Sequence, residues 1–292
     1  KAKGVFGIGV ALEYVFGLFY IDSGFKQKVD LIAGEDIASY ATTTDAQQLA
    51  GAGALGLPDI NLPGGLLDVL NTIGGSAIGE DYYRLFLSVD SQATALFAQV
   101  TWALSERWTV TPGIRFNREE KDVIVTGESF CAAKALIPNC VLGTFLDSAD
   151  YAERDLNKKE SDVSPKLSIQ YFMTENANLF LTAARGFKGG GFNGSSFNGE
   201  NLEFDSEEAS TIEFGMKGKF FENTLEFNAT IFQTKFDNLQ VLAYNGTLFD
   251  VENAASATAE GLEVDFRWLT PLQFLSVSGS AGYLDARYDE YD

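Results

Sequence analysis

Apolar and polar side chains alternate along much of this chain. In residues 4–21 every even position from Phe6 to Tyr20 is large and apolar, whereas most odd positions are glycine, alanine or a polar residue. A repeat of two residues is the period of a β-strand, because successive strand side chains point to opposite faces. A helix would spread these side chains around its circumference and lose about 1 kcal/mol for each glycine. The segment is therefore predicted to be a strand and not a membrane-spanning helix.

The same alternation returns in later segments, which lie at 96–102, 108–117, 163–171, 211–219, 225–231, 262–268 and 275–283. We predict at least nine strands, each with one apolar and one polar face. A soluble β-sandwich alternates in the same way, so the connections must distinguish the two. Short turns are predicted at 105–107, 174–176, 221–223 and 270–272, and long connections at 22–81, 127–160, 188–205 and 240–255. Short turns at one end and long loops at the other are typical of a transmembrane β-barrel.

Aromatic residues gather near the predicted short turns. All three tryptophans, Trp102, Trp108 and Trp268, lie there, as a girdle at a membrane boundary would require; packing of an ordinary core is the alternative. Several strands exceed the roughly 9–11 residues that cross a bilayer, so we expect them to project on the outer side. The pattern still runs at both chain ends, and open strand edges are costly in lipid. The chain is therefore predicted to be part of a larger antiparallel barrel.

Composition narrows the function. The chain has 292 residues, of which 46% are hydrophobic, which excludes general disorder. Its net charge of −20 opposes nucleic acid as a partner. It has no histidine, which is the commonest metal ligand and general base. No nucleophile stands beside a base, and no carboxylate pair belongs to a recognisable pocket motif. We therefore predict no enzyme activity, no metal site and no cofactor.

The two cysteines, Cys131 and Cys140, lie nine positions apart in a polar stretch that contains proline. They are predicted to form a disulfide, because a zinc site needs more ligands than two thiols. A ring of about ten residues gains roughly 2 to 3 kcal/mol in the chain-entropy account, and the bond implies an oxidising compartment. No signal peptide is visible before the first strand pattern, so we expect either a mature protein or a piece of a longer one.

A series of short motifs also runs along the chain in a fixed order. It comprises the hairpin at 95–121, SPKL at 164–167, ARGFKGGGFN at 184–193, EFGMK at 213–217, FDNLQV at 236–241, VENAA at 251–255 and AEGLE at 259–263. This series resembles the barrel of the TonB-dependent outer-membrane receptors over nearly all of residues 5–288. Each motif alone is weak, whereas their order is specific.

The resemblance implies about nine strands of a 22-stranded barrel in the bacterial outer membrane, with short periplasmic turns and long extracellular loops. Residues 1–292 would be part of the receptor barrel domain, 22–81 an extracellular insertion, and 127–160 an extracellular loop with the cysteine pair. The function implied is TonB-driven import of a scarce substrate such as an iron-siderophore. The partners implied are outer-membrane lipid and lipopolysaccharide, a small-molecule substrate, the plug domain of the same parent chain, and TonB through that plug. The sequence departs from the family pattern in having no plug, no TonB box and no terminal strand that ends in an aromatic residue.

Charged side chains on the polar faces of the strands form one candidate set. They mix both signs, which suits a lumen wall that hydrogen-bonds to a plug; the alternative is cross-strand pairing worth 0.2 to 1 kcal/mol per pair. The set is Arg115, Glu119, Lys166, Glu213, Lys217, Glu226, Glu263, Asp265 and Arg267.

Loop residues form the candidate ligand-binding set, because function concentrates in loops. Around the glycine-rich run 186–193, Arg185 and Lys188 offer charge and Phe187 and Phe192 offer stacking surface, with Asn193 beside them. The run is not a phosphate loop, since no helix pattern follows it. A second group, Tyr244 and Phe249, flanks Asn245-Gly246, with loop packing as the alternative. The 22–81 insertion includes an apolar run at 66–70 that is predicted to form a short helix over the mouth.

Acidic residues crowd the outer half of the chain, where divalent cations could bridge them to lipopolysaccharide, although a solvated rim is the default. Two other functions stay open: a surface scaffold barrel without transport, and a secreted β-sandwich or sugar-binding module. The barrel interpretation fails if Phe214, Ile231, Val264 and Val277 pack against a second sheet.

Overall fold

A computed structural model describes residues 2–7, 11–32, 82–130, 150–194, 199–244, 249–272 and 274–291. These residues contain strands and no helix, and so no helix that is long and apolar enough to span a membrane. The ten strands of the main sheet are β1 (Ala2–Gly7), β2 (Ala11–Ile32), β3 (Tyr82–Ala103), β4 (Trp108–Phe130), β5 (Tyr151–Thr174), β6 (Ala177–Lys188), β9 (Glu207–Phe220), β10 (Leu225–Tyr244), β11 (Phe249–Leu269) and β12 (Ser276–Tyr291). A small ribbon pairs β7 (Gly191–Phe192) with β8 (Glu203–Phe204).

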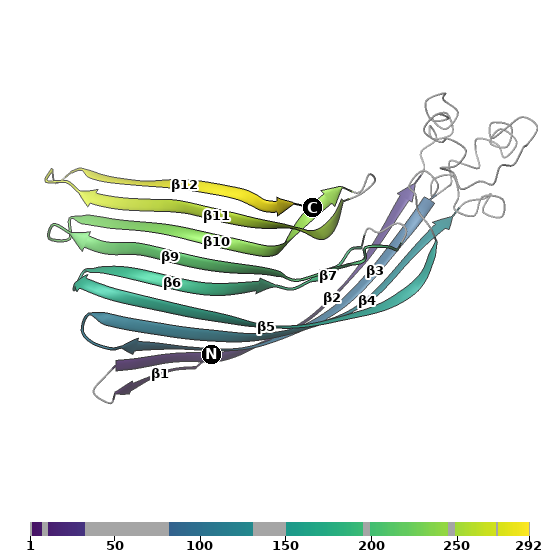
Figure 1. Cartoon of the computed structure of the whole chain (residues 1–292), viewed down its shortest axis with the longest axis horizontal. Helices are drawn as coiled ribbons and strands as arrows, with labels where there is room; N and C mark the ends of the chain where they lie inside the picture. Colours follow the sequence, from purple (N-terminus) through teal and green to yellow (C-terminus); the bar gives the residue numbers. More distant parts are fainter. Residues whose placement is uncertain are drawn as a thin grey trace, which may run out of the picture.

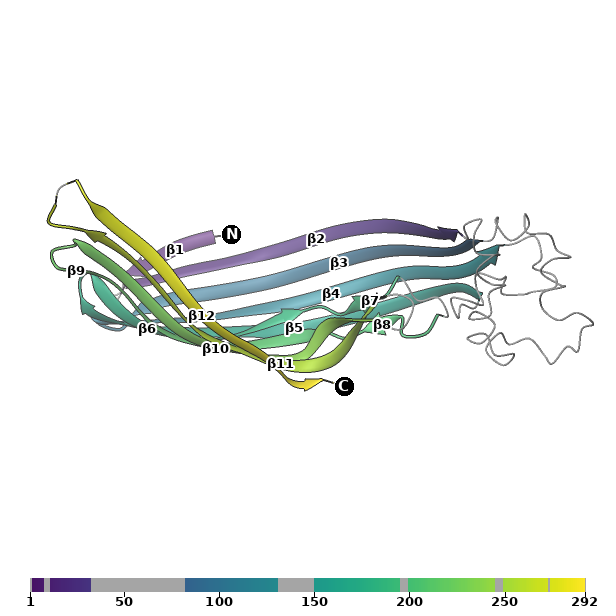
Figure 2. The ribbon, with the colours of Figure 1, turned by 90° about the horizontal axis from the view of Figure 1, so that it is seen from above.

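Each strand of the main sheet lies antiparallel to the strand before it and the strand after it in the chain, with only β7 and β8 left out of the order. Figure 1 shows this sheet as an open, twisted surface, and Figure 2 shows its curvature from above. Short connections at 104–107, 175–176, 221–224 and 270–275 lie at one end, which we call the turn end. The opposite end, where β2 ends and β3 begins, is the loop end. The predicted all-β antiparallel fold is confirmed.

The prediction of one strand at 4–21 is wrong, because the segment holds two. Gly7 pairs with Ala11 and Ala2 pairs with Phe16, so the chain reverses between β1 and β2. The even-numbered apolar positions continue through the reversal, since Phe6 pairs with Leu12. Periodicity alone therefore could not reveal the turn.

The strands also extend further than predicted at the loop end. β2 continues to Ile32, β4 to Phe130 and β5 begins at Tyr151, so the strands occupy the margins of the predicted insertions at 22–81 and 127–160. The predicted long connection at 240–255 is mostly strand, because Tyr244 pairs with Phe249. An Asn-Gly dipeptide lies between them, which is a strong hairpin signal. The apolar run at 66–70 and both cysteines lie outside the described residues, so the helix and the disulfide stay predictions.

One face of the sheet, the apolar face, carries a continuous row of exposed apolar side chains. Register places Leu181 beside Phe214, Phe214 beside Ile231, and Ile231 beside Leu262. Their exposed fractions are 42%, 48%, 53% and 41%. No second sheet covers this row in the described part of the chain. Burying such a surface gains about 25 cal/mol per Å², so an apolar surrounding would stabilise this face.

The tryptophans at the turn end belong to the same face. Trp102, Trp108 and Trp268 are between 43% and 46% exposed. The rings of Trp108 and Tyr171 lie 4.7 Å apart across neighbouring strands. These positions fit a girdle at a membrane boundary and not the interior of a core.

In the described part of the chain, the buried apolar side chains cluster at the loop end, on the opposite or polar face. There the inward side chains of β3 and β4, including Tyr83 and Val123 with no exposed surface, pack with Leu202 of the connection between β6 and β9. The described parts of this connection, 189–194 and 199–206, thus lie against the sheet and form part of the candidate site.

Candidate functional site

The polar face carries the predicted lumen residues in register across the strands. Lys219, Glu226 and Arg267 form one row, and Lys217, Asn228 and Asp265 form the next. Asn228 donates a hydrogen bond to Asp265 at 2.9 Å. Alternation therefore places charges of both signs on one wall.

Some of these charges find partners on the sheet. The Nζ of Lys217 lies 5.2 Å from the centre of the Phe180 ring, and Glu119 forms an ion pair with Lys121 at 3.1 Å. Arg115 donates to the Asn117 side chain at 2.5 Å. These three side chains and Asp265 therefore have partners on the same wall.

Most of the predicted set is not paired in this way. Among the residues that the structure describes, no ion pair within 4.0 Å joins Lys166, Glu213, Glu226, Glu263 or Arg267 to another side chain. Glu226 and Arg267 are direct register partners, and still they do not close to that distance. These five side chains thus form no close cross-strand ion pair in the described part of the chain, and their role on the wall stays a prediction.

The connection between β6 and β9 lies against the polar face at the loop end. Glu160 accepts a hydrogen bond from the Gly190 backbone N–H at 2.8 Å, and Lys121 donates to the Gly190 carbonyl. A side chain at Gly190 would collide with the Phe204 backbone carbonyl, which no rotamer change can relieve. The run is therefore rich in glycine because its backbone packs too closely against strands to leave room for side chains.

Asn193 locks this connection to the outer part of β11. Its side-chain NH₂ donates to the carbonyls of Asn201 and Val251, both at 2.9 Å, and its side-chain oxygen accepts from the Val251 N–H at 2.9 Å. The residue is only 5% exposed. Its amide thus substitutes for a neighbouring strand along the edge of β11.

The other predicted ligand residues near this run have different surroundings. Arg185 lies at the end of β6, where its guanidinium contacts Glu208 and lies 3.6 Å from the buried carboxylate of Asp162. Phe192 packs against the loop-end core. By contrast, Lys188 is 61% exposed and pairs loosely with Glu207 at 3.6 Å. Lys188 is the more exposed of the two cations in this group.

Tyr244 and Phe249 form an exposed aromatic pair at the tip of the β10–β11 hairpin. Their ring centres are 5.2 Å apart, and the side chains are 61% and 62% exposed. Neighbouring Leu242 is 68% exposed. The structure therefore brings the two residues of the second predicted group together as an exposed apolar surface. Their role in ligand binding stays a prediction.

The sequence analysis assigned no role to Lys158, Gln240 or Asn253. In the structure, these three side chains hold the connection between β6 and β9. Lys158 forms an ion pair with Asp205 at 2.9 Å, and Gln240 donates to the Gly189 and Asp205 carbonyls at 3.1 and 2.9 Å. Asn253 donates to the same Asp205 carbonyl at 2.9 Å. Gln240 and Asn253 stand in the motifs FDNLQV and VENAA, so the motifs were the available signal.

The buried tyrosines at the loop end have shifted acidity. Burial raises the pKa of Tyr151 to about 12 and raises that of Tyr83 further. On the outer part of β2 and β3, the hydrogen bond from Arg84 lowers the pKa of Asp30, and Lys28 adds to this. The Arg84 guanidinium reaches both Asp30 oxygens at 2.7 and 3.1 Å. In the described residues, no group of three or more acidic, cysteine or histidine side chains is arranged to hold a metal ion.

Comparisons with known proteins agree with this architecture. The family model described as "TonB dependent receptor-like, beta-barrel" matches residues 7–292. The chain belongs to the TonB-dependent receptor family. Its barrel is a partial one, because the chain spans about a quarter of the curated relatives that it matches: 24% of the length of each.

The relatives of this TonB-dependent receptor barrel are receptors. The pesticin receptor of Yersinia pestis is 23% identical over 180 residues, or 61% of this chain. The metal-pseudopaline receptor CntO of Pseudomonas aeruginosa is 24% identical over 200 residues, or 68% of this chain.

Solved structures share the fold. The siderophore receptor PiuA from Acinetobacter baumannii aligns with a TM-score of 0.60 at 17% identity, covering 99% of this chain and 37% of that one. The ferric yersiniabactin uptake receptor FyuA from Yersinia pestis aligns with a TM-score of 0.54 at 14% identity, covering 99% of this chain and 39% of that one. At these identities the likeness concerns the fold alone.

Proposed function

We propose that the parent protein of this chain is an outer-membrane importer of a scarce small molecule of the iron-siderophore class, coupled to TonB. The turn end would face the periplasm and the loop end the exterior, with lipid and lipopolysaccharide around the apolar face. The proposal gives the chain no catalytic role and no cofactor. It rests on family membership, and on relatives whose names describe receptors for siderophores or a metal complex.

The single observation that carries the proposal is the contrast between the two faces. The apolar face is exposed and continuous, which suits lipid, whereas the polar face keeps several charges without ion pairs. Charges that are left unpaired on a wall require water or a polar partner. A plug domain supplied by the rest of the parent chain would be such a partner, and Lys166, Glu226 and Arg267 would face it.

Substrate capture would occur at the loop end. Lys188 offers an accessible cation for an anionic chelate, and the aromatic pair Tyr244 and Phe249 offers stacking surface. Phe192 and Asn193 would act indirectly, because their contacts hold the connection in place, whereas the contacts of Arg185 link β6 to β5 and β9.

The test is uptake by the intact parent protein. Radiolabelled iron should enter cells that carry this receptor as their only one when it is offered on a panel of siderophores, and uptake should cease when TonB is deleted. Uptake that persists without TonB would contradict the coupling. No uptake of any iron chelate, together with a stable protein complex on the cell surface, would instead support a scaffold barrel.

A further inference from the structure

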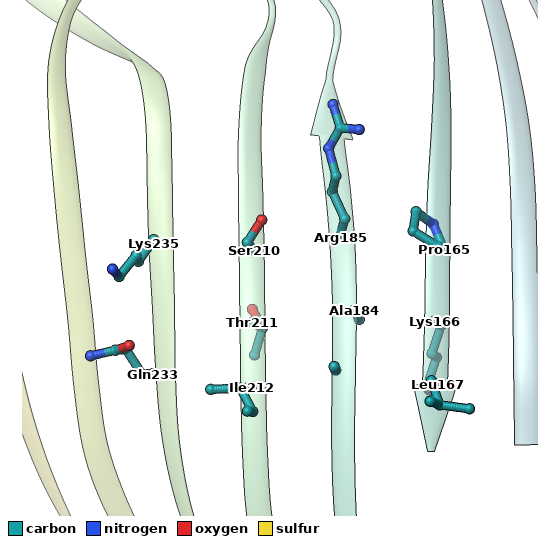
Figure 3. A pocket seen from close by; sticks show the side chains of 11 residues that line it. Pro165, Lys166, Leu167, Ala184, Arg185, Ser210, Thr211, Ile212, Gln233 and Lys235 are labelled. Carbon is teal, nitrogen blue, oxygen red and sulfur yellow. The ribbon is translucent and has the colours of Figure 1, made fainter. Parts of the chain in front are cut away.

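A shallow hollow opens on the sheet where β5 separates from β6. The pairing of these strands ends at Lys166 and Ala184, although β6 continues to Lys188. Figure 3 shows the side chains around the hollow, which come from β5, β6, β9 and β10. Its volume is about 500 Å³, and 11 residues line it.

Register assigns most of these side chains to the apolar face. Leu167, Ala183, Ile212 and Gln233 form one row across the four strands, and Arg185, Ser210 and Lys235 form the next row toward the loop end. Ala183 and Ser210 are short side chains between longer ones, which is why the surface is hollow there. Lys166 also lines the hollow, although alternation gives its side chain to the polar face.

The hollow lies at the boundary of the lipid-facing band. The row immediately toward the turn end is the exposed apolar row of Leu181, Phe214 and Ile231. The row immediately toward the loop end pairs Phe187 with Glu208 and Glu208 with Asp237, which is mostly polar. A ligand in the hollow would therefore have hydrocarbon below it and water above it.

The charged side chains around the hollow indicate what kind of ligand it could bind. The chain has 41 acidic against 21 basic residues, yet the lining side chains on the apolar face include Arg185 and Lys235 and no carboxylate. The Arg185 guanidinium contacts the carboxylates of both Glu208 and Asp162. Lys235 is exposed and forms no ion pair among the residues that the structure describes. Nearby Glu260 is engaged by Gln233 at 3.0 Å and by Arg287 at 3.3 Å.

We propose that this hollow binds a phosphate-bearing lipid of the outer leaflet, with a phosphate group at Lys235 and Arg185 and acyl chain against Leu167, Ala183 and Ile212. The site rests on the proposed membrane setting but not on substrate transport. Ammonium and guanidinium groups bind phosphate with charge-assisted hydrogen bonds, and the apolar row supplies hydrocarbon contact.

The experiment measures lipid retained by the purified full-length receptor in detergent, by native mass spectrometry, with lipid A as the probe. Lys235→Gln should lower the amount of retained lipid A about threefold to tenfold, because it removes one exposed charge-assisted contact. Ala183→Leu should lower it as well by filling the hollow, with both cations intact. The matched control is Lys219→Gln, which removes a lysine from the polar face and should change nothing.

Two further probes test whether the hollow recognises the phosphate groups of an intact lipid or binds free phosphate equally well. Enzymatically dephosphorylated lipid A should be retained less by the wild type, and Lys235→Gln should not weaken it further. Equal retention of both lipids by the wild type, or displacement of lipid A by an equal concentration of inorganic phosphate, would overturn the proposal. Because siderophore uptake is not the readout, loss of uptake and loss of lipid binding are separately visible.

Discussion

At the scale of the residue, Asn193 explains how a glycine-rich connection keeps a fixed shape. Glycine backbone is free to move, so its position must come from contacts with other segments. Asn193 supplies three hydrogen bonds, two of which mimic a strand partner for Val251. An asparagine side chain has the donors and the acceptor on one planar group, as a peptide does.

Replacement of this side chain should release the connection. Asn193→Ala leaves the Val251 N–H and C=O without this partner, and a backbone group that loses its hydrogen bond away from water costs about 1 to 3 kcal/mol. We expect faster hydrogen exchange of the Val251 amide and faster proteolysis within 189–206, with the rest of the sheet protected as before. Asn228→Ala, on the polar face of β10, is the control. Unchanged exchange at Val251 would show that the lock is not needed.

The buried tyrosines predict a pH response in the alkaline range. The pKa of Tyr151 is raised from the ordinary value of 10.0 to about 12 by burial, so its neutral form is favoured in the folded protein. This stabilising contribution is complete below pH 10 and disappears as the pH rises from there through the folded pKa. Ultraviolet titration should show a late tyrosinate step that Tyr151→Phe reduces. A Tyr151→Phe protein with an unaltered titration curve would contradict this assignment.

At the scale of the element, two glycines within strands differ in how closely their surroundings pack. At Gly215 an added Cβ would lie 2.6 Å from both the Ala229 carbonyl and the Phe180 ring, because Phe180 covers this glycine from the neighbouring strand. At Gly186 the nearest atom, the Ala209 carbonyl, is 4.0 Å away. The first glycine is required by packing, whereas the second is not.

The pair gives a direct comparison of stability. Gly215→Ala forces the backbone or the Phe180 ring to move and should destabilise the folded barrel by about 1 to 3 kcal/mol. Gly186→Ala should be neutral or stabilising by about 0.4 to 1 kcal/mol, since it restricts only the unfolded chain. Urea unfolding of the full-length receptor in detergent micelles, followed by gel migration of the folded form, measures both. Equal midpoints for the two variants would contradict the packing argument.

At the scale of the whole molecule, the two faces of the sheet should meet different media. Leu262 and Glu263 are neighbours in β11 that point to opposite faces, and they pair with Ile231 and Thr230. If the apolar face touches lipid, a spin label at Leu262→Cys should collide more with oxygen, and a label at Glu263→Cys should collide more with a water-soluble nickel chelate. The background replaces Cys131 and Cys140 by serine. Equal accessibility at the two sites would argue against a lipid-facing wall.

The sequence by itself determined the all-β antiparallel fold, the positions of the four predicted short turns and the two-faced wall. These follow from local alternation, because a period of two fixes which face each side chain takes. The family resemblance read from the ordered motifs was also sufficient to predict the receptor barrel.

Only the tertiary structure decided where strands ended and what the loop residues do. The reversal between Gly7 and Ala11 was invisible because the alternation runs through it, and β10 and β11 continue where a loop was predicted. Asn193 and Arg185 became structural contacts because strands distant in sequence converge at the loop end. The hollow beside Ala183 likewise arises from side chains of four strands, and no local pattern records which of them become neighbours.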